Sequence, residues 1–121
     1  MDRIEEITRD GKNILYIDFS KFKSNDEFAK VIEEGKPLVR KYEENSLYTI
    51  TNIEGVRYDT STKEIMTEWM IHNKPYVKHG VVIGLDGIKK IMFNALFTLS
   101  GRKSMDIAST KEAAIELLLQ K

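Results

Sequence analysis

The sequence predicts a single α/β domain whose mostly parallel sheet has about five strands, with about four helices packed against it. Short apolar or β-branched runs alternate along the chain with longer segments in which apolar residues recur at helical spacing. Three of the longer segments are preceded by a Ser-x-x-Glu arrangement, which is typical of a helix N-terminus. The alternation predicts the element order ββαβαβαβα over residues 1 to 121, with right-handed crossovers between parallel strands.

The chain is expected to begin with a β-hairpin. Asp10-Gly11 lies between two apolar stretches, and glycine adopts the positive φ of such a turn at little cost. Residues 3 to 9 are therefore predicted to form an antiparallel edge strand. The run from Ile14 to Ile17 is continuously apolar, as expected of a central strand that is covered on both faces.

The first helix is expected to begin at about residue 25. Ser24 is placed to act as its N-cap, and Glu27 completes a capping box. Apolar residues follow at helical spacing, but Gly35 and Pro37 interrupt the pattern. The sequence therefore leaves two alternatives, one bent helix or two short helices.

The remaining elements continue the alternation. A strand is predicted over residues 47 to 53, because β-branched and aromatic residues alternate there between turn residues. A helix is expected from a capping box at Ser61 to Pro75, and a third capping box at Ser109 precedes a last helix that runs through Leu119. Between these two helices we expect short strands at residues 81 to 83 and 105 to 108, and the clearest amphipathic helix of the chain at residues 88 to 99.

Composition excludes several classes of protein. The 121 residues are 41% apolar, and no linker or low-complexity tract divides them, so a single domain is expected. The absence of cysteine excludes disulfide scaffolds, zinc ribbons and thiol catalysis. Because 19 basic residues balance 19 acidic ones, no overall field favours nucleic acid. No apolar run approaches the roughly 20 residues of a membrane span, and signal-peptide features are missing. We therefore expect a cytoplasmic protein.

Three parts of the sequence resemble small bacterial STAS-like proteins. They are residues 46 to 60, residues 73 to 78 with 81 to 84, and residues 87 to 91 with 94 to 95 and 100 to 102. The resemblance covers most of the chain from residue 10 onward. It implies the βα superhelix of the sporulation anti-sigma-factor antagonist, a fold that is also related to the lipid-binding CRAL-TRIO domain. Characterised members of this family bind a partner protein.

The resemblance also implies a candidate regulatory site. Many of the antagonists are switched by phosphorylation in an Asp-Ser-Ser/Thr-Gly motif at the start of the second helix. The matching residues here are Asp59, Thr60, Ser61 and Thr62, with Thr62 in place of the glycine. A phosphate would meet free backbone N–H groups at this helix end. The alternative is purely structural, because Ser61 and Glu64 also form a capping box.

A second candidate site consists of large apolar residues on two predicted helices. Its members are Met66, Trp69, Met70, Phe93 and Phe97. Packing in the core explains all five, and it is the interpretation that we favour. The alternatives are a pocket for an apolar small molecule or lipid, or an exposed patch for a partner or a second copy of the chain.

No catalytic constellation is apparent in the sequence. His72 and His79 share no metal-ligand spacing, and Ser100 lacks the residues of a nucleophile elbow. Gly84 to Gly87 could cradle an anion, although Asp86 is better explained as a helix N-cap. We therefore expect no cofactor and no catalytic or metal-binding residue. The sequence predicts a non-catalytic interaction or regulatory module, with a carrier or sensor of an apolar molecule as the alternative.

Overall fold

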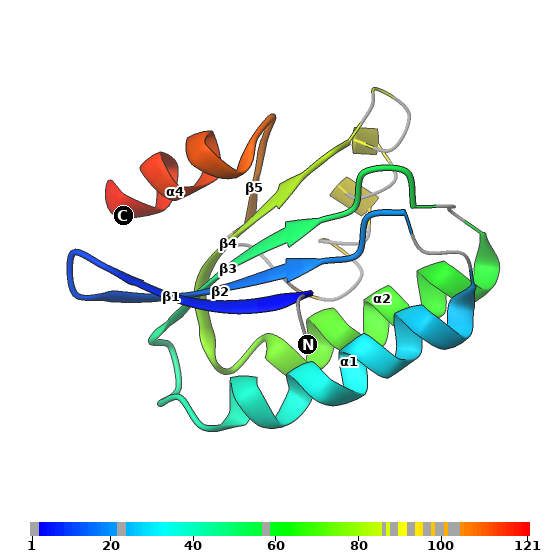
Figure 1. Ribbon diagram of the computed structural model, residues 1–121, viewed down its shortest axis with the longest axis horizontal. Helices are drawn as coiled ribbons and strands as arrows, with labels where there is room; N and C mark the ends of the chain where they lie inside the picture. Colours follow the sequence, from blue (N-terminus) through cyan, green and yellow to red (C-terminus); the bar gives the residue numbers. More distant parts are fainter. Residues whose placement is uncertain are drawn as a thin grey trace.

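The computed structural model describes residues 3–21, 24–56, 59–85, 87, 90–91, 94–95, 98, 101 and 105–121 (Figure 1). It confirms the α/β class. Its elements are β1 (Ile4–Arg9), β2 (Lys12–Asp18), α1 (Asn25–Arg40), β3 (Leu47–Asn52), α2 (Thr60–Asn73), β4 (Val77–Ile83), β5 (Met105–Ala108) and α4 (Lys111–Leu119). Three helices are described in full, one fewer than the four expected. Of the expected helix over residues 88 to 99, the structure describes residues 90–91, 94–95 and 98, and these are helical.

The five strands form one mixed sheet in the order β1-β2-β3-β4-β5. Strands β1 and β2 are antiparallel, and each of the other neighbouring pairs is parallel, which confirms the predicted antiparallel edge strand. Because each right-handed crossover moves one strand further in the same direction, α1 and α2 lie on the same face. Helix α4 covers the opposite face (Figure 1). Buried apolar residues accordingly form two clusters, one on each side of the sheet.

The N-terminal hairpin forms as the turn residues predict. Asp10 and Gly11 have φ values of 52° and 76°, the positive values that a two-residue hairpin turn requires at both positions. This turn sets the register in which Arg9 pairs with Lys12. Strand β2 is covered on both faces, because Ile14 belongs to the α4 side of the core whereas Leu15 belongs to the side of α1 and α2.

Helix α1 is one helix, so the alternative of two short helices is wrong. The Ser24 side chain accepts a hydrogen bond from the Glu27 backbone N–H, which confirms the predicted N-cap. Pro37 lies inside the helix. Gly35 is buried against α2, where a Cβ atom would be 2.8 Å from Trp69 Cη2. This glycine therefore permits close packing of two helices and does not end the first one.

Two predicted N-caps are wrong by one or two residues. Helix α2 is capped by Asp59 instead of Ser61, and the Asp59 carboxylate accepts a hydrogen bond of 2.9 Å from the Thr62 backbone N–H. Helix α4 is capped by Thr110, the residue after Ser109. The physical reason is that adjacent Ser, Thr and Asp residues all cap well, and the local chain path determines which of them reaches the free N–H groups.

The end of α1 is attached to the edge strand through Glu6. Its carboxylate accepts a hydrogen bond of 2.7 Å from the Tyr42 hydroxyl and lies 2.6 Å from Lys41 Nζ. The hydrogen bond from Lys41, and then that from Tyr42, holds the pKa of Glu6 below its ordinary value. Burial of the ring, and then the hydrogen bond to Glu6, raises the pKa of Tyr42 to about 12.

This attachment predicts a loss of stability at high pH. The Tyr42 hydroxyl ionises near pH 10.0 in the unfolded chain and at about 12 in the folded protein. Its contribution should therefore be complete below pH 10.0 and decrease as the pH rises towards 12. Tyrosine titration followed by NMR should show the late ionisation. The change Glu6→Gln should lower the Tyr42 pKa, whereas Glu5→Gln should leave it unchanged, because Glu5 pairs with Lys111.

Candidate interaction surface on helix α2

The first turn of α2 contains the four residues of the candidate regulatory site. Thr60 and Ser61 are exposed. Thr62 is only 2% exposed, and its hydroxyl donates a 3.4 Å hydrogen bond to Asn25 Oδ1 at the start of α1. Asp59 is occupied as the N-cap. A modifying enzyme could thus reach Thr60 and Ser61, whereas Thr62 is inaccessible while the helix is folded.

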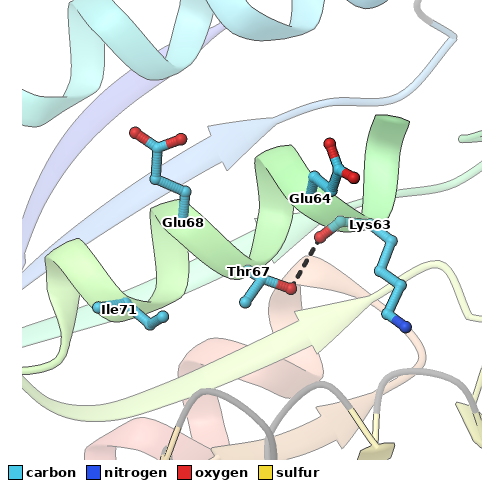
Figure 2. A pocket seen from close by; sticks show the side chains of 5 residues that line it. All are labelled: Lys63, Glu64, Thr67, Glu68 and Ile71. Atoms are coloured by element: carbon cyan, nitrogen blue, oxygen red, sulfur yellow. Dashed lines mark hydrogen bonds between the residues drawn. The ribbon is translucent and has the colours of Figure 1, made fainter. Parts of the chain in front are cut away.

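A hollow of about 360 Å³ lies beside the exposed side of α2. It is lined by Lys63, Glu64, Thr67, Glu68 and Ile71 (Figure 2). The Thr67 hydroxyl donates to the Lys63 carbonyl at 2.8 Å, which satisfies it within the helix and leaves the methyl group to the hollow. Ile71 is 53% exposed, and it adds the largest apolar side chain to the lining of the hollow. The hollow therefore offers apolar surface with charged groups at its rim.

Thr60 and the hollow belong to one stripe of α2. Residues three or four positions apart lie on the same side of a helix, and Thr60, Lys63, Thr67 and Ile71 follow this spacing. The accessible hydroxyl thus lies at the N-terminal end of the same stripe that borders the hollow. Sequence reasoning missed this stripe. The feature of the sequence that could have revealed the stripe is Ile71, an apolar residue one position away from the buried side of the helix.

A second hollow, of about 260 Å³, lies between α1 and α2. It is lined by Ala29, Ile32, Glu33, Lys36, Ile65 and Glu68. Lys36 Nζ lies 3.2 Å from a Glu33 oxygen and 3.3 Å from a Glu68 oxygen. The hydrogen bond to Glu33, and to a smaller extent that to Glu68, raises the pKa of Lys36. Glu68 borders both hollows, and its ion pair with Lys36 links α2 to α1.

The candidate ligand residues on α2 are buried. Met66, Trp69 and Met70 face the sheet and belong to the core, so they form no exposed partner patch. They line an internal cavity of about 10 Å³. Such a volume holds about one water molecule, whereas sites for organic ligands measure roughly 300 Å³ or more. Phe93 and Phe97 lie outside the described residues.

The two histidines lie in separate clusters. His72 contacts Arg40 and Asn73. His79 Nε2 lies 2.6 Å from Asp106 Oδ2, an oxygen that is also 3.6 Å from Lys121 Nζ. The sequence analysis did not predict the contact between His79 and Asp106, because these residues are 27 positions apart and meet only through the pairing of β4 with β5.

The remaining expectations can be compared with the structure only within the part of the chain that it describes. Within that part, no three His, Asp or Glu side chains converge in a way that could hold a metal ion. None of the described helices combines the length and hydropathy needed to cross a bilayer. Asp86 of the candidate anion cradle and Ser100 lie outside the described residues.

Comparison with known proteins adds no family assignment. No protein-family model matches the chain, and no curated protein matches its sequence. The resemblance to STAS-like proteins therefore stays a prediction from the sequence.

Proposed function

We propose that the protein is a non-catalytic, cytoplasmic regulatory module of STAS type that binds a partner protein through the exposed side of α2. One observation carries the proposal: an accessible hydroxyl, Thr60, and an apolar hollow of about 360 Å³ share one stripe of the same helix. Phosphorylation at Thr60, with Ser61 as the neighbouring alternative, is the proposed switch.

The hollow suits an apolar side chain that a partner inserts at the centre of an interface. Docking would cover Ile71 and the Thr67 methyl group, and removal of apolar surface from water is the main favourable term in association. The charged groups of Lys63, Glu64 and Glu68 would lie at the rim, where they favour specificity and correct orientation more than affinity. This arrangement resembles the apolar centre and polar rim of known interfaces.

A phosphate on Thr60 would weaken this docking. It adds a charge of about −1.5 to −2 that is strongly hydrated. A partner that covers the stripe would have to remove that hydration, and Asp59 and Glu64 already place negative charge nearby. We therefore expect the unmodified protein to be the binding form.

Site-specific photo-crosslinking in the native host tests the proposal. A photo-reactive amino acid in place of Thr67 should capture one partner, whereas the same group in place of Glu116, exposed on α4, should not capture it. In the protein that carries the photo-reactive group at position 67, Ile71→Ser and Thr60→Glu should each reduce the amount of captured partner about tenfold. The first substitution removes an apolar contact, and the second adds a negative charge. Thr60→Ser should have little effect.

The exposed Ile91 supplies the matched control. It is another large apolar residue with high exposure, and it lies in the segment where the sequence predicted an alternative partner patch. Capture that is lost with Ile91→Ser but unaffected by Ile71→Ser would place the interface outside α2 and contradict the proposal. Equal capture from positions 67 and 116 would contradict it as well.

We do not propose the alternative function, capture of an apolar molecule or lipid. Three of the five residues that suggested it, Met66, Trp69 and Met70, surround a cavity of only about 10 Å³. Entry of an organic ligand would require these core side chains to move apart.

A further inference from the structure

A small polar cluster interrupts the apolar contact between α2 and the sheet. Thr49 and Thr51 lie two residues apart on the central strand β3, and Asn73 is the last residue of α2. Their exposed fractions are 4%, 6% and 3%. All three line the same internal cavity of about 10 Å³. Buried polar groups of this kind need hydrogen-bond partners, because burial without one costs free energy.

The two threonine hydroxyls have no hydrogen bond to another residue of the described chain. In that same part of the chain, no fully enclosed side-chain nitrogen or oxygen lacks a partner. The hydroxyls therefore keep some accessible surface. Since both residues are almost completely buried, the cavity that they share is where this surface lies.

The contacts of His72 orient the Asn73 side chain. Arg40 Nη1 lies 3.2 Å from His72 Nε2, and a guanidinium can only donate, so Nε2 is the acceptor. The proton of the neutral ring is then on Nδ1, which donates to Asn73 Oδ1 at 2.8 Å. With its oxygen directed to His72, the Asn73 amide keeps two N–H donors for other groups.

We propose that this cavity binds one ordered water molecule that links the Thr49 and Thr51 hydroxyls to the Asn73 amide. Its volume is close to the minimum that a water molecule needs, and its three polar neighbours are within the two to four that buried water usually has. The water accepts from the Asn73 N–H and exchanges hydrogen bonds with the hydroxyls. It thereby attaches the C-terminal turn of α2 to the central strand.

Gly80 maintains the space beside this water site. It pairs with Thr49 on one side and Met105 on the other. A Cβ atom at Gly80 would lie 2.8 Å from Thr49 Oγ1 and 2.7 Å from Met105 Sδ. Any larger residue would therefore push the threonine hydroxyl or the methionine out of place. The remaining walls are Met66, Trp69, Met70, Val82 and Met105, and the indole N–H of Trp69 is the one strong hydrogen-bond donor among their side chains.

The direction in which two isosteric substitutions change the stability of the protein tests the proposal. If the water is bound, Thr49→Val and Thr51→Val each break a bridged network and leave its other members unsatisfied, so each should lower the folding equilibrium constant about tenfold. The double variant should lower the folding equilibrium constant by less than the product of the two single factors, because both single variants lose the same water molecule. If the cavity is dry, valine replaces an unsatisfied hydroxyl with a methyl group, and both variants should be more stable than the wild type.

Chemical denaturation measures the stabilities, with Thr8→Val as the control because Thr8 is exposed on β1. The control should change the equilibrium constant less than either core variant. Independently of the variants, NMR of the wild-type protein should show cross-relaxation between water and protons of Thr49, Thr51 or Trp69. Unchanged or increased stability of both core variants, or the absence of this cross-relaxation, would overturn the proposal. Failure of docking at α2 would leave it intact.

Discussion

Replacement of Gly84 by alanine should destabilise the protein by about 2–5 kcal/mol, an unusually large effect for one methyl group. Gly84 follows β4 with a φ of 85°, a left-handed value that costs any other residue free energy. In addition, its Cβ atom would lie 2.5 Å from the backbone nitrogen of Glu54 and 2.8 Å from the Glu54 Cα. Neither backbone atom can move without disturbing the adjacent ends of β3 and β4.

Gly55 separates the two causes of this effect. Its φ is 73°, close to that of Gly84, but a Cβ atom there would meet nothing within 4 Å. Gly55→Ala should therefore cost only the backbone strain, about 1 kcal/mol. Thermal and chemical denaturation of the two variants gives the difference directly. Equal losses of stability would show that the contact with Glu54 contributes nothing.

The change Trp69→Ala should be the most damaging in the core of α2, at about 3–5 kcal/mol. The indole is only 2% exposed, and it fills the space between α1, α2 and the sheet. Its removal leaves a large void and takes away the group against which Gly35 packs. Chemical denaturation, followed by far-ultraviolet circular dichroism because the only tryptophan is lost, measures the effect.

A double-mutant cycle between Gly35 and Trp69 tests the proposed cause. In the wild type, Gly35→Ala should destabilise, because the new Cβ atom would lie 2.8 Å from Trp69 Cη2 in a packed core. In a Trp69→Phe background that outer ring atom is absent. There the same change should stabilise by up to about 1 kcal/mol, the advantage of alanine over glycine within a helix. An effect of Gly35→Ala with the same sign in both backgrounds would contradict close packing as the reason for the glycine.

The elements that sequence reasoning predicted correctly are those encoded within a few neighbouring residues. Asp10-Gly11 predicts the hairpin because two adjacent residues must both accept positive φ values. The alternation over β3 and the N-cap at Ser24 are equally local. The N-caps at Asp59 and Thr110 were missed where several adjacent residues could all accept the same hydrogen bond.

The candidate site, like the fold, was predicted from the sequence only in part. The sequence indicated the start of α2 as a modifiable segment, but it did not distinguish the buried Thr62 from the exposed Thr60. It also suggested that Met66, Trp69 and Met70 gather on one side of a helix, without the volume of the space that they surround. Accessibility and cavity volume depend on what packs against a side chain, and that information lies in distant segments.

By itself, therefore, the sequence determined the α/β class, the hairpin, the order of the described strands and helices and the buried side of α2. Tertiary structure alone decided that Gly35 permits close helix packing, that Thr60 and Ile71 share an exposed stripe, and that Thr49, Thr51 and Asn73 meet at one cavity. The physical reason is the distance along the chain over which each effect acts. Backbone preferences and hydrophobic periodicity act between near neighbours, whereas burial, close contact and cavity shape arise when segments far apart in the chain pack together.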